Sequence, residues 1–145
     1  MISIQFNKYN FKISQKEEIT YIFDEVRKKN VILTPEEWVR QNFIHYLIYD
    51  LHYSKGKIAA EKEFKLNGVK KRLDLLVFDK KTQPFLLLEC KAQSENLNEI
   101  VLTQCLNYNM KFAVPYIFIS NGDYTFGWEN LNNRMTVLKQ FPEYV

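Results

Sequence analysis

Three ionisable side chains interrupt two strongly apolar segments of this sequence. Asp74 lies inside the run 72–78, and Glu89 and Lys91 close the run 85–91. Segments this apolar are normally buried, and a buried strand excludes ionised groups unless another charge compensates them. A divalent metal ion is the natural compensator for two carboxylates, because hard cations prefer oxygen ligands. The spacing therefore predicts a metal site with a lysine beside it.

The polar segment between the two runs predicts how they pair. Residues 79–84 read Asp-Lys-Lys-Thr-Gln-Pro, which is turn-prone, so we expect two neighbouring antiparallel strands joined by a short loop. In a symmetric loop Phe78 faces Phe85, and the same count sets Asp74 opposite Glu89 on one face of the sheet. The lysine that follows shares that face, because strand side chains alternate with period two.

A second turn extends the predicted sheet to a three-stranded meander. Asn67-Gly68 favours a two-residue hairpin that joins strand 58–66 to strand 69–78. Counting outward from this turn predicts two charged rows: a carboxylate row of Glu61, Asp74 and Glu89, and a mixed row of Glu63, Arg72 and Lys91. The opposite face is expected to belong to the core and to carry Ile58, Ala60, Leu73, Leu75, Val77, Leu86, Leu88 and Cys90. A slip of one residue would exchange the two faces.

Two helices are expected to flank the meander. The first runs from Thr34, its N-cap, to about Tyr53, and Glu37 occupies the capping-box position. The second covers about 96–111, and Gln104 interrupts its apolar stripe one turn before Tyr108. That stripe comprises Leu97, Ile100, Val101, Cys105, Tyr108 and Phe112.

The order helix, three strands, helix, strand predicts an α/β fold with a mixed β-sheet flanked by helices. A chain of 145 residues, 46% of them hydrophobic, is expected to form one domain, 1–145. Within it we expect an N-terminal extension with short strands at 1–33, a core at 34–128, and a tail at 129–145 that adds a strand or packs irregularly. Further strands are predicted at 115–120 and 124–128.

Composition narrows the class of protein. The longest apolar stretches are shorter than a membrane span and the N-terminus lacks the features of a signal peptide, so we expect a cytoplasmic protein without a membrane partner. Cys90 and Cys105 are predicted to be buried thiols in a reducing compartment. His45 and His52 lack zinc-site spacing and are expected to be structural or solvated. The net charge of +3 is compatible with nucleic-acid binding without demanding it.

The carboxylate on one strand followed by Glu-x-Lys on the next resembles the core of the PD-(D/E)xK nuclease superfamily, with Leu73 in place of the proline. The segment from Gln104 to Tyr108 is similar to the QxxxY motif of one branch of these nucleases. Together with 34–41, Arg72-x-Asp74 and Glu89-Cys90-Lys91-Ala92, these motifs resemble the N-terminal nuclease domain of type I restriction enzyme R subunits, in stand-alone form, over roughly 18–122. No GxxxxGK(S/T) loop is present, so no motor is expected in this chain.

The resemblance implies a restriction-endonuclease-like core and hydrolysis of DNA phosphodiesters that depends on Mg²⁺, with Mn²⁺ as a substitute. The implied metal ligands are Asp74, Glu89 and the backbone carbonyl of Cys90. Lys91 is implied to orient or deprotonate the attacking water, or to stabilise the developing charge. Gln104 and Tyr108 are implied to bind substrate or brace that lysine; a core glutamine bonded to backbone is the alternative for Gln104.

Further residues carry two interpretations each. Glu37 is either a metal ligand through water, as the resemblance implies, or part of a capping box. Glu61 is either a ligand, from its place in the carboxylate row, or the partner of a nearby cation. Four cationic side chains are expected either to contact DNA or to form a solvated face. These are Lys70, Lys71, Arg72 and Arg40.

Three functions are therefore compared. The first is a metal-dependent DNA endonuclease of restriction, defence or repair type, with DNA as a partner, a homodimer as a further expectation, and a motor or specificity partner in trans. The second is a non-catalytic DNA-binding or assembly module that keeps the nuclease fold. The third is a small α/β protein in which Glu89 and Lys91 are merely paired surface charges.

Overall fold

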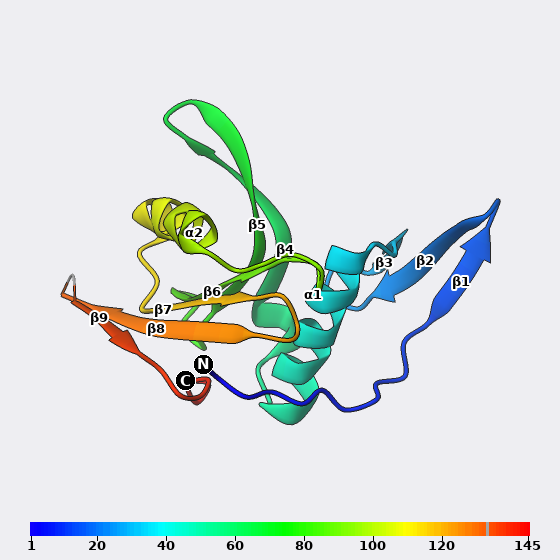
Figure 1. Cartoon of the computed structure of the whole chain (residues 1–145), viewed down its shortest axis with the longest axis horizontal. Helices are drawn as coiled ribbons and strands as arrows, with labels where there is room; N and C mark the ends of the chain where they lie inside the picture. Colours follow the sequence, from blue (N-terminus) through cyan, green and yellow to red (C-terminus); the bar gives the residue numbers. More distant parts are fainter. Residues whose placement is uncertain (133) are drawn as a thin grey trace.

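A computed structural model describes residues 1–132 and 134–145, and within them the chain forms two β-sheets and two α-helices (Figure 1). The small sheet consists of β1 (Ile13–Lys16), β2 (Ile19–Asp24) and β3 (Lys29–Ile32). The large sheet consists of β4 (Ile58–Leu66), β5 (Val69–Phe78), β6 (Pro84–Cys90), β7 (Tyr116–Ser120), β8 (Thr125–Leu131) and β9 (Arg134–Val137). The helices are α1 (Pro35–His45), continued by a π-helical turn at Tyr46–Asp50, and α2 (Glu99–Phe112); a short 3₁₀ turn covers Lys55–Lys57.

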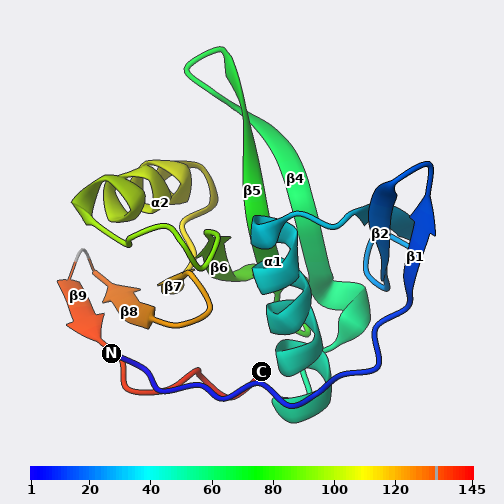
Figure 2. The same ribbon diagram turned by 45° about the vertical axis from the view of Figure 1, so that its right-hand side comes forward.

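The large sheet is mixed, as the sequence predicts. Its strands lie in the order β4-β5-β6-β7-β8-β9, and neighbours run antiparallel except for the parallel pair β6 and β7. Helix α2 connects these two parallel strands, which need a crossover of this kind. Figures 1 and 2 show α1 and α2 on different sides of the sheet. The arrangement is an α/β fold of the restriction-endonuclease-like kind.

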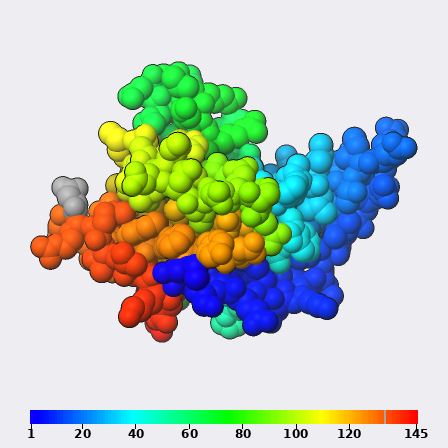
Figure 3. Space-filling view, viewed as in Figure 1, coloured from blue at the N-terminus to red at the C-terminus, as the bar shows by residue number. Residues whose placement is uncertain are grey.

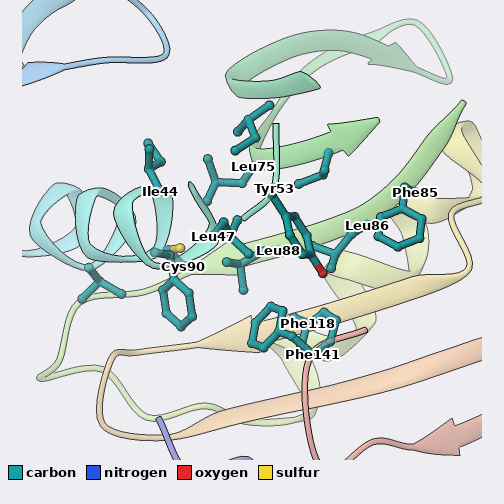
Figure 4. Packing of buried hydrophobic residues seen from close by; sticks show 14 of the residues in the cluster. Ile44, Leu47, Tyr53, Leu75, Phe85, Leu86, Leu88, Cys90, Phe118 and Phe141 are labelled. Atoms are coloured by element: carbon teal, nitrogen blue, oxygen red, sulfur yellow. The ribbon is translucent and has the colours of Figure 1, made fainter. Parts of the chain in front are cut away.

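Both faces of the central strands are buried, each under its own helix. On β6, Leu86 and Leu88 pack in the cluster that contains residues of α1, such as Phe43, and Figure 4 shows part of that cluster. Leu87, between them, packs instead in the cluster that contains Cys105 of α2. This alternation explains why the strands read as continuous apolar runs, because a strand covered on both faces has no solvent side.

The predicted pairing of β5 with β6 is confirmed, with one local exception. Leu75 faces Leu88 and Val77 faces Leu86, the register that sets Asp74 against Glu89. At the end of the pair a bulge shifts the register, so that Phe78 faces Pro84. The expected pairing of Phe78 with Phe85 is wrong, because the loop is not symmetric.

The pairing of β4 with β5 follows the predicted count but is interrupted beside Asp74. Lys62 faces Leu73 and Ala60 faces Leu75, whereas Glu61, between them, adopts a φ of 54°. The expected side-chain alternation is also wrong here: Leu73 packs in the α2-side cluster and Leu75 in the α1-side cluster. A break in strand pairing of this kind changes the direction of the neighbouring side chains. This one lies next to the carboxylate of Asp74.

Both ends of the chain add short strands. The short N-terminal strands form the small antiparallel sheet next to α1, and an extended segment, 1–12, leads to it past α1 (Figure 2). The tail adds β9, and Phe141 then stacks on Phe118 with ring centroids 4.0 Å apart. One expectation for α2 is wrong: Ile100 is 76% exposed. None of the helices in the described residues is long and apolar enough to cross a membrane.

Gly127 tests the packing of this core. A Cβ atom at this position would lie 2.2 Å from Cε1 of the buried Phe118 ring, which is stacked on Phe141. Replacing Gly127 by Ala should lower the free energy of unfolding by about 1–3 kcal/mol, because the ring must leave its packed position. Urea denaturation measures this difference. Gly56→Ala is the control, since a Cβ there meets no atom within 4 Å; equal effects of the two substitutions would contradict the packing.

Candidate functional site

The structure brings Asp74 and Glu89 together inside the protein. Asp74, on β5, is 6% exposed and Glu89, on β6, is 4% exposed. Oδ2 of Asp74 accepts a hydrogen bond of 2.7 Å from the backbone N–H of Cys90, and Oδ1 accepts one of 2.8 Å from Nη2 of Arg40. The aspartate is therefore fixed both by the neighbouring strand and by α1.

Glu89 is the less compensated of the two carboxylates. Burial, the negative charge of Asp74 and a hydrogen bond to Asp74 raise the pKa of Glu89 to about 9, although the charge of Lys91 acts in the opposite direction. Oε2 of Glu89 is buried and has no hydrogen-bond partner among the described residues. Oε2 of Glu89 is thus a buried hydrogen-bond acceptor, and the cations near it do not fully compensate the charge of the carboxylate.

Lys91 follows the end of β6 and is half-buried. Its backbone N–H donates a hydrogen bond of 2.8 Å to the carbonyl of Ser120, which continues the parallel pairing of β6 with β7. Its positive charge favours the ionised form of both Glu89 and Glu36 by lowering their pKa values, although burial raises both more strongly. The ammonium group therefore influences the same carboxylate cluster, and its position on the face of Glu89 stays a prediction.

Arg40 is the principal cation within this cluster. It lies on α1, is 4% exposed, and forms ion pairs of 2.7 Å with Glu37, 2.7 Å with Glu61 and 2.8 Å with Asp74. Burial by itself lowers the pKa of an arginine, but the charges of Asp74 and Glu37 outweigh it and raise the pKa of Arg40. Arg40 is one of the cations expected to contact DNA or to form a solvated face. Its guanidinium lies inside the protein among carboxylates, which contradicts the solvated face, and a contact with DNA stays a prediction.

A chain of alternating charges continues from Arg40 to the small sheet. Nη2 of Arg27 contacts Glu37 at 2.8 Å, and Nε of the same arginine contacts Asp24 at 2.6 Å. Gln41 donates a hydrogen bond of 2.9 Å to Asp24 as well. Sequence reasoning missed Arg27 and Gln41. The spacing of Glu37 to Arg40 and Gln41, three and four residues along one helix, is the signal that could have found part of the network.

Glu37 fits neither of its two interpretations fully. Its backbone N–H donates to Oγ1 of Thr34 at 3.0 Å, which confirms the predicted N-cap. Its carboxylate, however, binds Arg27 and Arg40 and does not complete a capping box. Both carboxylate oxygens are engaged by arginine, so a role as a metal ligand through water stays a prediction.

Gln104 and Tyr108 lie on α2 and bind each other. Nε2 of the half-buried glutamine donates a hydrogen bond of 2.6 Å to the tyrosine hydroxyl. Neither makes a hydrogen bond to Lys91 within the part of the chain that the structure describes, and the glutamine does not bond to backbone there either. Both side chains line a groove of about 630 Å³ between α2 and the β4–β5 hairpin, together with Lys71.

The hairpin formed by β4 and β5 carries the remaining predicted cations. It projects beyond α2, as the space-filling view in Figure 3 shows. Lys70 is paired with Glu63 at 3.0 Å, and Arg72 is paired with Glu63 at 3.2 Å and with Glu61 at 3.6 Å. Lys71 faces the groove beside α2 and makes no ion pair within residues 1–132 and 134–145. Lys71 is therefore the least neutralised cation of the predicted group.

The carboxylates are not arranged as a ready-made multidentate cage. Among the described residues, no group of three or more His, Cys, Asp or Glu side chains could hold a metal ion. The reason is visible in the contacts: Arg40 stands between Asp74, Glu61 and Glu37. What remains is a pair of carboxylates, Asp74 and Glu89, next to the backbone of Cys90 and to Lys91.

These features define a class: an α/β protein whose mixed sheet brings Asp and Glu-x-Lys from neighbouring strands to one buried cluster. Comparison with protein families agrees with this class. The sequence matches the family described as Type I restriction enzyme R protein N terminus over residues 35–142, and the chain belongs to that family. A search of curated proteins gave no match. The N-terminal sheet precedes the matched region.

Arg40 provides a test of the cluster. Replacing it by Met keeps the length of the side chain but leaves Glu37 and Asp74 buried without their shared cation. The free energy of unfolding, measured by urea denaturation at pH 7, should fall by about 3–5 kcal/mol. Arg72→Met is the matched control, because that side chain is 62% exposed and its surface pairs should contribute less than about 1 kcal/mol. A loss for Arg40 as small as that for Arg72 would refute its compensating role.

Proposed function

We propose that this protein is a metal-dependent endonuclease that hydrolyses DNA phosphodiester bonds in restriction, defence or repair. The observation that carries the proposal is the buried pair of Asp74 and Glu89 with Lys91 on the adjoining strand end. Membership of the restriction-enzyme R family supports the same reaction class. Burying two carboxylates in contact costs stability, as the raised pKa of Glu89 shows, so a role beyond folding is the better explanation.

The donor set suits a hard divalent cation such as Mg²⁺ or Mn²⁺. The unpartnered Oε2 of Glu89 is a buried oxygen acceptor, and the Asp74 carboxylate and the Cys90 carbonyl are the further donors that we assign to the site. When bound, such an ion supplies a coordinated water of lowered pKa and neutralises charge on the phosphate. Glu61, which pairs with Arg40 and Arg72, is assigned to charge balance.

The chain's own residues have separate tasks in this proposal. The Cys90 N–H and Arg40 hold Asp74 in one orientation, so its carboxylate needs no reorganisation when substrate arrives. Lys91 acts on the attacking water, by holding it or by accepting its proton, or it neutralises the charge that develops on the phosphate. Gln104 and Tyr108, fixed by their mutual hydrogen bond, bind substrate in the groove beside Lys71.

The second candidate function is a non-catalytic DNA-binding or assembly module. It is favoured by one observation: Arg40 already neutralises part of the carboxylate cluster, so the fold is stable without a metal cage. Under this alternative a partner protein in trans, and not this chain, supplies the cleavage activity. The two candidates share DNA as a partner and differ in whether cleavage depends on Asp74 and Lys91.

Cleavage of supercoiled plasmid separates these candidates. With Mg²⁺ or Mn²⁺ the wild-type protein should nick or linearise the plasmid, and EDTA should stop the reaction. Asp74→Ala and Lys91→Ala should each lower the initial rate by about 100-fold or more, because they remove a cation ligand and a charge at the reacting phosphate. The controls are Asp123→Ala and Lys80→Ala, both at exposed positions. Cleavage that survives both site substitutions would reject this site, and no cleavage of any DNA form would favour the module.

The hairpin predicts a specific dependence of DNA affinity on salt. Lys71→Ala should weaken binding of a duplex and reduce the slope of log K against log salt concentration by about 1, as expected for the loss of one phosphate contact. Fluorescence anisotropy in EDTA measures the slope without cleavage. Lys139→Ala, which changes an exposed lysine of the tail, is the control and should leave the slope unchanged. Identical slopes for all three proteins would exclude Lys71 from the DNA contact.

A further inference from the structure

A second cavity lies on the other flank of α1, outside the carboxylate cluster. It measures about 440 Å³ and lies between the N-terminal segment, the first half of α1 and the loops that follow β6 and β7. This volume falls within the range of small-molecule sites, about 300–1,000 Å³. The N-terminal segment crosses close to the lower part of α1 in both Figure 1 and Figure 2.

Aromatic rings form the main wall of this cavity. Trp38 and Phe11 are both half-buried, and their ring planes meet at 62° with centroids 5.1 Å apart. The Tyr9 ring lies 5.9 Å from that of Phe11, and the His45 ring lies 4.5 Å from it, as measured between ring centroids. The rings are thus held by one another and present a preformed apolar surface, which is the type of surface on which nucleobases stack.

The polar groups around the rings are few, and most of them are carboxamides. Asn42 and Gln93 supply carboxamides, and the Asn42 amide is oriented by a hydrogen bond of 2.9 Å to the Trp38 carbonyl. Carboxamides are the side chains that pair with base edges. Lys8 is the charged residue of the lining, and no carboxylate lines the cavity within the described part of the chain. The lining therefore suits an aromatic ligand that carries hydrogen-bonding edges and a negative charge.

The cavity shares two elements with the candidate active site. On α1, Glu37 and Arg40 contact the carboxylate cluster, while Trp38 and Asn42 line the cavity. After β6, Gln93 follows Lys91 by two residues. The same helix and the same strand end therefore contribute residues to both places.

We infer that the cavity lined by Trp38, Phe11, Asn42 and Gln93 binds an unpaired nucleobase of the DNA strand, with Lys8 on its phosphate. This inference rests on the proposed function, because it takes DNA as the substrate. It adds a preference for single-stranded or locally unpaired DNA, since a base inside a duplex is stacked on its neighbours and must be extruded before it reaches such a pocket.

The test compares the affinities of single-stranded and double-stranded DNA in EDTA, where cleavage does not contribute. A 12-nucleotide strand with one 2-aminopurine and its perfect duplex are titrated with the full chain, and anisotropy gives each Kd. Trp38→Leu and Gln93→Ala should weaken single-strand binding about tenfold while duplex affinity changes less than twofold, because only the unpaired base stacks in the cavity. Quenching of 2-aminopurine by the wild-type protein should be lost in Trp38→Leu.

The controls separate this inference from folding and from catalysis. Gln93 is exposed, so Gln93→Ala should unfold at the same temperature as the wild type, and Gln83→Ala, an exposed glutamine of the β5–β6 loop, should bind as the wild type does. Unchanged single-strand affinity in both cavity variants, or no single-strand binding by the wild type, overturns the inference. If the wild-type protein nicks the plasmid while the cavity variants bind single strands normally, only the inference about the cavity is refuted. If the cavity variants lose single-strand affinity but the wild-type protein cleaves no DNA, only the proposed catalysis is refuted.

Discussion

The contact on which the rest of the structure depends is the guanidinium of Arg40 among Glu37, Glu61 and Asp74. It joins α1 to both strands of the β4–β5 hairpin, and Arg27 extends the same network to the small N-terminal sheet. Such a network is costly to desolvate, and its members stabilise the fold only while each charge keeps its partner. The positions of the helix, the hairpin and the N-terminal sheet are therefore linked through one set of charges.

This network also divides the carboxylates into two groups. Glu37 and Glu61 are paired with arginine, whereas Glu89 retains an unpartnered oxygen and a raised pKa. Asp74 belongs to both groups, because Arg40 binds one of its oxygens and it adjoins Glu89. The arginines thus provide a supporting shell, and the reactive part of the proposed site is confined to Asp74, Glu89 and Lys91. Supporting contacts of this type keep a site in its working geometry.

Much of the sheet could be predicted because its signals are local. The Asn67-Gly68 turn, the polar segment before Pro84 and the period-two alternation sufficed for the register that sets Asp74 against Glu89. The errors lie where the backbone departs from regular geometry, at the bulge of Phe78 and at the positive φ of Glu61. Ile100 was misplaced for another reason: a helical stripe gives the period of the buried face but not its width.

The sequence by itself determined the strand pairing, the start of α1 and the residue types that meet at the end of the sheet, because turns, caps and alternation act over a few residues. Only the tertiary structure decided what those residues do to one another. Arginine is a residue type that normally lies at the surface, yet contacts with β4 and β5 bury Arg40 and orient its guanidinium towards Asp74. The aromatic cavity also joins segments far apart in the chain, from Phe11 to Gln93. Ion pairing and ring packing depend on distances in space, and no local pattern specifies those distances.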